Sequence, residues 1–206
     1  NGSASKSCIM PRWITGPTAR AEVHRLRAGA DAIAVGIGTV LADDPSLTVR
    51  DAPLPRVPPK RVIFDSRLRT PAESALVRTA REVPTVIVAR QADAATRRSL
   101  EASGVTILVA HSTRDALAQL RELEIRSLLV EGGAGLAGSL LADDLVDRVI
   151  IFQSPIELGS DALGAFEYAP PGFAAVLERR AIIERGTLGD DTMTTYALHE
   201  IPCSPD

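Results

Sequence analysis

The segment 127–141 constrains the fold more than any other part of this sequence. It reads SLLVEGGAGLAGSLL, an apolar run at 128–130 followed by closely spaced glycines and a second apolar run. The first run is typical of a buried strand, and the glycines are compatible with a turn into a helix. A strand, a glycine turn and a helix in this order present free backbone N–H groups and the positive end of a helix dipole to an anion such as phosphate.

Each residue of this turn has an expected role. Gly132 and Gly133 permit a sharp turn, while Gly135 and Gly138 let the helix approach its neighbours closely. Glu131 is a carboxylate at the carboxyl end of a buried strand, beside the expected anion site. That position indicates a contact with substrate. A tight strand-to-helix turn without any ligand would account for the glycines equally well.

The remaining chain alternates between short apolar runs and amphipathic segments, and then changes character. Strands are predicted at 31–36, 60–67, 84–90, 105–110, 128–130 and 146–152, and helices at 17–29, 93–103, 113–123 and after Gly38. Two extended runs, 178–186 and 192–200, flank the hairpin signal Gly189-Asp190-Asp191. We therefore predict one α/β domain over 1–206, with a mixed, mostly parallel sheet, helices on both faces and an antiparallel hairpin at the edge.

Composition narrows the class of function. The net charge is −3 and the basic residues are dispersed, which does not indicate a nucleic-acid partner. Cys8 and Cys203 lie near opposite ends and match no metal-ligand spacing, so we expect free thiols in a cytoplasmic protein. No apolar run is long enough to span a membrane. Only three histidines are present, which argues against zinc chemistry or a Ser-His relay.

A second glycine turn and several arginines follow other predicted elements. Gly36-Ile-Gly38-Thr39 continues from the strand at 31–36, and two such turns in one α/β domain can bind the two ends of a dinucleotide. Arg27, at the end of the helix predicted at 17–29, is placed to bind an anion, although a solvated helix face explains it as well. Arg50 ends a short extended piece, 47–50.

The strand predicted at 60–67 ends in polar residues. Ser66, Arg67 and Arg69 could surround a phosphate, including the extra phosphate that distinguishes NADP from NAD. An ordinary charged turn is the alternative.

Five segments together resemble a known family: WITGP at 13–17, AGADAI at 28–33, GTVLADDPSLTVR at 38–50, VIFDSR at 62–67 and VEGGAGLAG at 130–138. They are similar to the C-terminal reductase domain of the bacterial bifunctional riboflavin-biosynthesis deaminase/reductase, which has a dihydrofolate-reductase-like fold. The resemblance implies a 5-amino-6-(5-phosphoribosylamino)uracil reductase. Such an enzyme transfers a hydride from NADPH to the ribosylamine carbon and yields the ribityl product. A homodimer is also expected.

The resemblance also implies site residues, matched position by position. The cofactor would contact the backbone at Trp13 and the residues Thr39, Asp43, Ser66, Gly133, Ala134, Gly135, Leu136, Ala137 and Gly138. The phosphorylated substrate would contact Arg27, Leu47, Arg50 and Glu131. No proton donor is evident; Asp43 and Glu131 are the carboxylates expected near both ligands, and neither is assigned as a general acid.

The chain departs from the family in three places. Pro11 stands where the family has a substrate-contacting serine, and proline offers neither a side-chain donor nor an N–H. The family also has a strand before the turn that Asn1-Gly2 matches, and that strand is expected to be missing here. The zinc-binding motifs of the deaminase half are absent, so neither zinc nor deamination is predicted.

Two other functions remain open at this stage. One is a different NADPH reductase of the dihydrofolate-reductase-like superfamily, acting on a pterin or another substrate; Arg27 and Arg50 argue against a pterin, which carries no phosphate. The other is a nucleotide-binding module without turnover. Oxidation of NADPH by the candidate substrate separates them.

Overall fold

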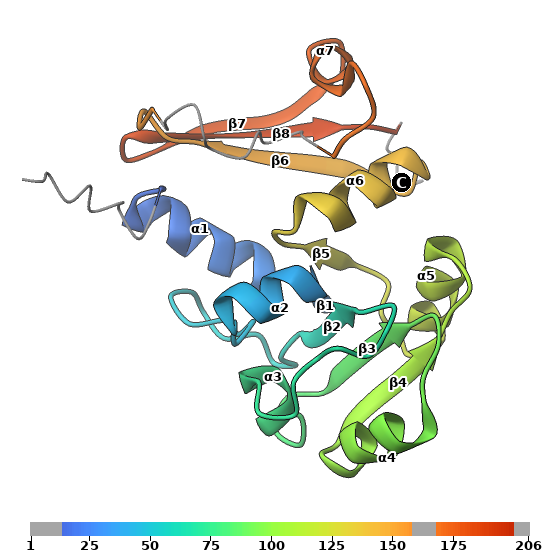
Figure 1. Cartoon of the computed structure of the whole chain (residues 1–206). Helices are drawn as coiled ribbons and strands as arrows, with labels where there is room; N and C mark the ends of the chain where they lie inside the picture. Colours follow the sequence, from blue (N-terminus) through green and yellow to red (C-terminus); the bar gives the residue numbers. More distant parts are fainter. Residues whose placement is uncertain (1–13, 158–167, 200–206) are drawn as a thin grey trace, which may run out of the picture.

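The computed structural model describes residues 14–157 and 168–199. Trp13 and Pro11, which the sequence places at the ligand site, lie outside these residues. Within the described part the chain forms two separate sheets, with helices packed on both faces of the larger one (Figure 1). The predicted α/β class, with a mostly parallel sheet and a C-terminal antiparallel hairpin, is confirmed.

The larger sheet has five parallel strands in the order β4-β3-β2-β1-β5. The strands are β1 (Ala32–Gly36), β2 (Lys60–Phe64), β3 (Thr85–Ala89), β4 (Val105–Val109) and β5 (Leu128–Val130). Each is a short run rich in β-branched or small apolar residues, as expected where both faces of a parallel sheet are covered. In the register of the central strands, Ala34 of β1 lies beside Val62 of β2 on one side and Val130 of β5 on the other.

The side of the sheet on which new strands are added changes at β1. The chain adds β2, β3 and β4 successively on one side of β1, and then returns to place β5 on the other side. A reversal of this kind leaves a crevice at the carboxyl ends of the two strands that flank it. Here that point lies between the end of β1 and the glycine turn that follows β5.

In the part of the chain that the structure describes, six helices accompany this sheet, and all of them except α3 were expected from the sequence. They are α1 (Pro17–Ala28), α2 (Ile37–Asp43), α3 (Ala75–Arg78), α4 (Ala94–Ala102), α5 (Thr113–Glu122) and α6 (Ala134–Ala142). Pro17 occupies the first turn of α1. The side chains of Asp93 and Ser112 cap α4 and α5 by accepting from backbone N–H groups of the first turn.

Alternate residues of β1 separate two hydrophobic cores. Ile33 and Val35 belong to the core that includes Leu76 of α3 and Leu100 of α4. Ala32 and Ala34 belong to the core on the opposite face, which includes Leu120 of α5. This period of two is the expected consequence of strand geometry.

The predicted hairpin does not join the edge of the parallel sheet. Instead β6 (Arg148–Gln153), β7 (Ile182–Leu188) and β8 (Asp191–Ala197) form an antiparallel sheet in the order β6-β8-β7, and α7 (Phe173–Leu177) packs against it. The single mixed sheet of the prediction is therefore two sheets. Helix α6 lies between β5 and β6 and carries the chain away from the parallel edge before β6 begins (Figure 1).

A partly buried hydrogen bond ties the start of α1 to the antiparallel sheet. Asp191, at the first position of β8, is 2% exposed, and its carboxylate accepts from the backbone N–H of Gly16 at 2.6 Å. Gly16 is the residue that caps α1. The turn between β7 and β8 thus holds the beginning of the helix that carries Arg27.

Some local features differ from the sequence-based expectation. The short helices α3 and α7 were not predicted, because four- and five-residue helices leave little periodic signal. The piece 47–50 is not a strand: Leu47 adopts a positive φ of 48° in an irregular loop. Within the described residues, none of the helices has the length and apolar character that a membrane span needs.

An arginine is buried at the amino end of the parallel sheet, opposite the expected site. Arg61 of β2 is 1% exposed. Its guanidinium donates to the hydroxyls of Thr79 and Thr85 and to the carbonyls of Leu76 and Val83. Burial lowers the pKa of Arg61 to about 10, so it remains charged at neutral pH. The hydrogen bonds of the Arg61 guanidinium therefore join β2 to α3 and to the loop before β3.

Candidate functional site

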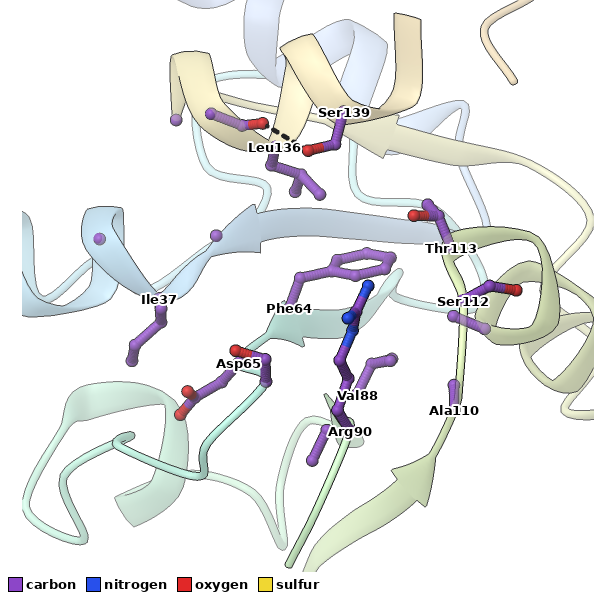
Figure 2. A pocket seen from close by; sticks show the side chains of 17 residues that line it. Ile37, Phe64, Asp65, Val88, Arg90, Ala110, Ser112, Thr113, Leu136 and Ser139 are labelled. Carbon is purple, nitrogen blue, oxygen red and sulfur yellow. Dashed lines mark hydrogen bonds between the residues drawn. The ribbon is translucent and has the colours of Figure 1, made fainter. Parts of the chain in front are cut away.

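A cleft of about 350 Å³ lies at the carboxyl edge of the parallel sheet (Figure 2). Every parallel strand contributes to it directly or through the loop that follows. Its lining consists of Gly36, Ile37, Gly38, Phe64, Asp65, Ser66, Val88, Ala89, Arg90, Ala110, Ser112, Thr113, Ala116, Gly133, Gly135, Leu136 and Ser139. This volume falls in the usual range for small-molecule sites, and the position is the one that the strand order predicts.

The turn from β5 into α6 forms one wall of the cleft. Gly132 and Gly133 have φ values of 61° and 72°, in the left-handed region that favours glycine. Gly133 caps α6 without any side-chain hydrogen bond, so the first N–H groups of the helix stay available. Thr39 of α2 supports the turn, because its Oγ1 lies 3.4 Å from the place that a Cβ of Gly133 would occupy.

Gly135 and Gly138 serve different purposes in α6. A Cβ added at Gly135 would meet nothing within 4 Å, and this residue lines the cleft. A Cβ added at Gly138 would lie 2.0 Å from the carbonyl oxygen of Tyr168. Gly135 therefore leaves open space for a ligand, whereas Gly138 lets the backbone at Tyr168 pack on the helix.

Glu131, on the other side of the same turn, is paired with Arg27 of α1. Nε of Arg27 donates to Oε1 of Glu131 at 2.7 Å, and Nη2 donates to Oε2 at 2.6 Å. Nη1 of Arg27 donates to the carbonyl of Thr48 at 2.9 Å. The side chains of Arg27 and Glu131 are 13% and 20% exposed. Two residues 104 positions apart in the sequence, both predicted at the substrate, are thus in contact.

The loop that carries Arg50 rests on α1 through His24. The backbone N–H of Arg50 donates to Nδ1 of His24 at 3.3 Å, and Nε2 of His24 lies 3.8 Å from the Asp51 carboxylate. Burial and the positive charge of Arg27 hold the pKa of His24 below its ordinary value of 6.5. Arg50 itself is exposed, so its guanidinium is free to meet an anion from solution.

Leu47 belongs to the same loop but faces inward. Its side chain is 3% exposed and packs in the core beneath α2 and α3. A contact between Leu47 and a substrate would therefore have to involve its backbone.

The loop after β2 differs from the predicted phosphate cradle. Ser66 lines the cleft, but Arg67 and Arg69 are not among the lining residues. Nε of Arg69 lies 3.7 Å from the carboxylate of Asp65, which also accepts from the N–H and the hydroxyl of Thr70. Arg69 is therefore engaged within its own loop.

Only some of the predicted cofactor residues lie at the cleft. Ser66, Gly133, Gly135 and Leu136 line the cleft, and Thr39 supports its glycine turn. Asp43, Ala134, Ala137 and Gly138 are not among the lining residues. Asp43 is exposed in the last turn of α2, away from the glycine end of that helix. No described cluster of His, Cys, Asp or Glu could hold a metal ion.

Several residues at the cleft were not singled out from the sequence. Phe64 ends β2, Arg90 follows β3, and Ser112 and Thr113 begin α5 after β4. A usable signal existed, because the carboxyl ends of all parallel strands meet at one edge. Applying this rule to β3 and β4, rather than only to the strands with glycine turns, would have identified Arg90 and Ser112. His24 was missed because it interrupts the apolar side of α1.

The parallel sheet, its reversal at β1 and the cleft beside two glycine turns define an open α/β domain with a ligand site at the switch point. Comparison with known proteins makes the assignment specific. The chain belongs to the RibD C-terminal domain family, which matches residues 2–174.

Relatives from bacteria and archaea support this assignment. The riboflavin biosynthesis protein RibD of Actinobacillus pleuropneumoniae is 40% identical over 155 residues, covering 72% of this chain and 40% of that protein. The 2,5-diamino-6-ribosylamino-4(3H)-pyrimidinone 5′-phosphate reductase of Methanothermobacter thermautotrophicus is 35% identical over 191 residues, covering 90% of this chain and 88% of that protein. The chain therefore spans less than half of the Actinobacillus RibD but most of the archaeal reductase.

Solved structures agree in fold. Acinetobacter baumannii RibD, form 1, superposes with a TM-score of 0.74 at 29% identity, over 94% of this chain and 53% of that one. The Thermotoga maritima deaminase/reductase has a TM-score of 0.73 at 24% identity, over 90% of this chain and 50% of that one.

Proposed function

We propose that this domain is the reductase of riboflavin biosynthesis that converts 5-amino-6-(5-phosphoribosylamino)uracil to its ribityl product with NADPH. The turn at 131–135 is the observation that carries the proposal. On one side of this turn Glu131 binds Arg27, and on the other Gly133 and Gly135 line the cleft. A cofactor at the glycines and a substrate near Arg27 would therefore lie on the two sides of one short segment.

The lengths of the relatives support the reductase half of the RibD reaction. The archaeal relative is named as a reductase and is matched over 88% of its length, whereas the Actinobacillus RibD is matched over 40%. The region common to both proteins is the one that this chain contains. The archaeal name states a reduction of the same type, on a diaminopyrimidinone in place of the uracil proposed here.

The residues of the cleft suit a nicotinamide dinucleotide. Free N–H groups at the start of α6, with the positive end of its dipole, would hold a pyrophosphate at Gly133 and Gly135, where no side chain blocks the approach. Bound NADPH would supply the hydride. The protein's contribution is to orient the two ligands, and Arg50 is the exposed cation available for the substrate phosphate.

The test is a direct assay of the purified protein. Absorbance of NADPH is followed with 5-amino-6-(5-phosphoribosylamino)uracil and, separately, with the diaminopyrimidinone that the archaeal name states, and the product is identified by mass spectrometry. We expect oxidation coupled to gain of two hydrogens by the substrate. An absence of oxidation with both compounds would refute the proposal. Sedimentation of the same sample tests the proposed homodimer.

A further inference from the structure

The acidic residue that follows β2 lines the cleft, but its carboxylate is engaged within its own loop. In dinucleotide-binding α/β domains an acidic residue near this point binds the 2′-hydroxyl of the adenosine ribose in NAD. Here Asp65 is 0% exposed, and one of its oxygens accepts from the N–H and the hydroxyl of Thr70 at 2.7 and 2.9 Å. The other oxygen faces the N–H of Arg67 and Nε of Arg69. Its carboxylate is therefore engaged inside the loop 65–70, where Arg69 supplies an opposite charge.

Arg90 lies beside this loop and is directed into the cleft. Its backbone N–H donates to the carbonyl of Ser66 at 3.2 Å, which holds the two residues next to each other at the ends of β2 and β3. Figure 2 shows the Arg90 side chain extending into the pocket. Among the residues that the structure describes, none forms a hydrogen bond or ion pair with this guanidinium.

The surroundings of Arg90 favour an anion. Ser66 and Thr113 place further hydroxyl groups in the lining, and Asp65 is the only carboxylate in the described lining. Asp115, in the first turn of α5, does not line the cleft and accepts from the N–H of His111. A guanidinium with adjacent hydroxyls, away from any free carboxylate, is a suitable site for a phosphate.

The position also matches one end of a dinucleotide. The glycine turn that would hold the pyrophosphate follows β5, and β2 and β3 lie two and three strand spacings from β5, about 10 and 14 Å. A cofactor whose pyrophosphate sits at Gly133 and whose adenosine runs along this edge would bring its ribose to Ser66 and Arg90.

We propose that Arg90, with Ser66, binds the 2′-phosphate of NADP(H) and makes this domain discriminate against NAD(H). The inference deepens the proposed function and rests on it. It also moves the phosphate site from Arg67 and Arg69, which the sequence alone indicated, to an arginine on the next strand. The ion pair between Asp65 and Arg69 weakens the repulsion that the Asp65 carboxylate would exert on that phosphate.

Calorimetric titration with NADP⁺ and NAD⁺ tests this assignment without any turnover. Wild-type protein should bind NADP⁺ more tightly, and Arg90→Ala should weaken NADP⁺ binding about 10- to 100-fold, the value of a charge-assisted bond to phosphate. NAD⁺ affinity should stay within about twofold. Arg67→Ala is the matched control, because it removes a neighbouring exposed arginine outside the cleft and should leave both affinities unchanged.

The outcomes separate the two proposals. If Arg90→Ala weakens NADP⁺ and NAD⁺ equally, or if Arg67→Ala reproduces the selective loss, the assignment of Arg90 is wrong while the reductase proposal stands. If wild-type protein binds neither dinucleotide, the proposed function fails and this inference fails with it. Because Arg90 is exposed and makes no described side-chain contact, its replacement should not prevent folding.

Discussion

Breaking the pair between Arg27 and Glu131 should affect both stability and substrate use. The pair has two charge-assisted hydrogen bonds at 2.6 and 2.7 Å and is mostly shielded from water. Hydrogen bonds to charged groups contribute about 1.5–3 kcal/mol, and breaking a fully buried pair costs about 3–5 kcal/mol. Because both side chains keep some contact with solvent, we expect Glu131→Gln or Arg27→Gln to lower the free energy of unfolding by about 2–3 kcal/mol.

A double-mutant cycle isolates the interaction itself. Urea denaturation of wild type, both single variants and the double variant, followed by circular dichroism, should give a coupling energy of at least about 1 kcal/mol. Arg25 and Glu22 provide the control on the same helix, because the Arg25 side chain is 59% exposed. Their cycle should give about 0.3–0.5 kcal/mol. Additive effects of Arg27 and Glu131, within about 0.5 kcal/mol, would refute a stabilising pair.

Kinetics of the Glu131→Gln variant then show whether the pair of Arg27 and Glu131 binds substrate or only stabilises the fold. The cleft glycines lie on the other side of the turn, so NADPH affinity should be retained. Replacing a two-oxygen acceptor by an amide should raise the substrate KM or lower turnover at least about tenfold, equivalent to ~1.4 kcal/mol. Unchanged kinetics in a measurably destabilised variant would show that the pair only supports the fold.

Three further perturbations follow from the structure. Arg61→Ala removes the guanidinium donors to the buried carbonyls of Leu76 and Val83 and should cost about 3–5 kcal/mol, lowering Tm by roughly 6–20 °C. Arg78→Ala, at an exposed position of α3, should change Tm little, and equal shifts would contradict this account. Since the folded pKa of His24 lies below 6.5, the unfolded chain takes up the proton first, so stability is complete above about pH 6.5 and falls as pH drops towards the folded pKa. Urea denaturation at a series of pH values should show that His24→Gln reduces this loss of stability below about pH 6.5. If the free energy of unfolding of the variant falls with pH as steeply as that of wild type, His24 is not the source of the effect. Gly135→Ala should stabilise α6 by up to about 1 kcal/mol while weakening NADPH binding, whereas Gly138→Ala should destabilise the protein by its clash at Tyr168; thermal melts and titrations of both variants check the contrast.

Local signals in the sequence predicted the parts of the fold that local chemistry determines. The glycine turn after β5 has the predicted conformation because positive φ at Gly132 and Gly133 is a property of single residues. The strands of the parallel sheet are recognisable because both of their faces are buried. The second sheet is separate because α6 leads the chain away from the parallel sheet. No local sequence pattern predicts that path.

Tertiary contacts decide what the site residues do. Arg27 and Glu131 were both indicated at the substrate, but their contact depends on the packing of α1 against the end of β5. Gly135 and Gly138 look alike in the sequence, and only the approach of Tyr168 distinguishes them. Arg90 was missed because an arginine after a strand has many possible roles until its neighbours are known.

The bond between Gly16 and Asp191 sets the order in which a growing chain can complete its structure. The two residues are 175 positions apart. During synthesis, all five parallel strands have been made once Val130 is added, and at about 5–20 residues per second they precede Asp191 by several seconds. The start of α1 therefore waits for the turn between β7 and β8. A nascent chain that stops short of this turn already contains Arg27 and Glu131 but lacks the anchor that holds the first turn of their helix.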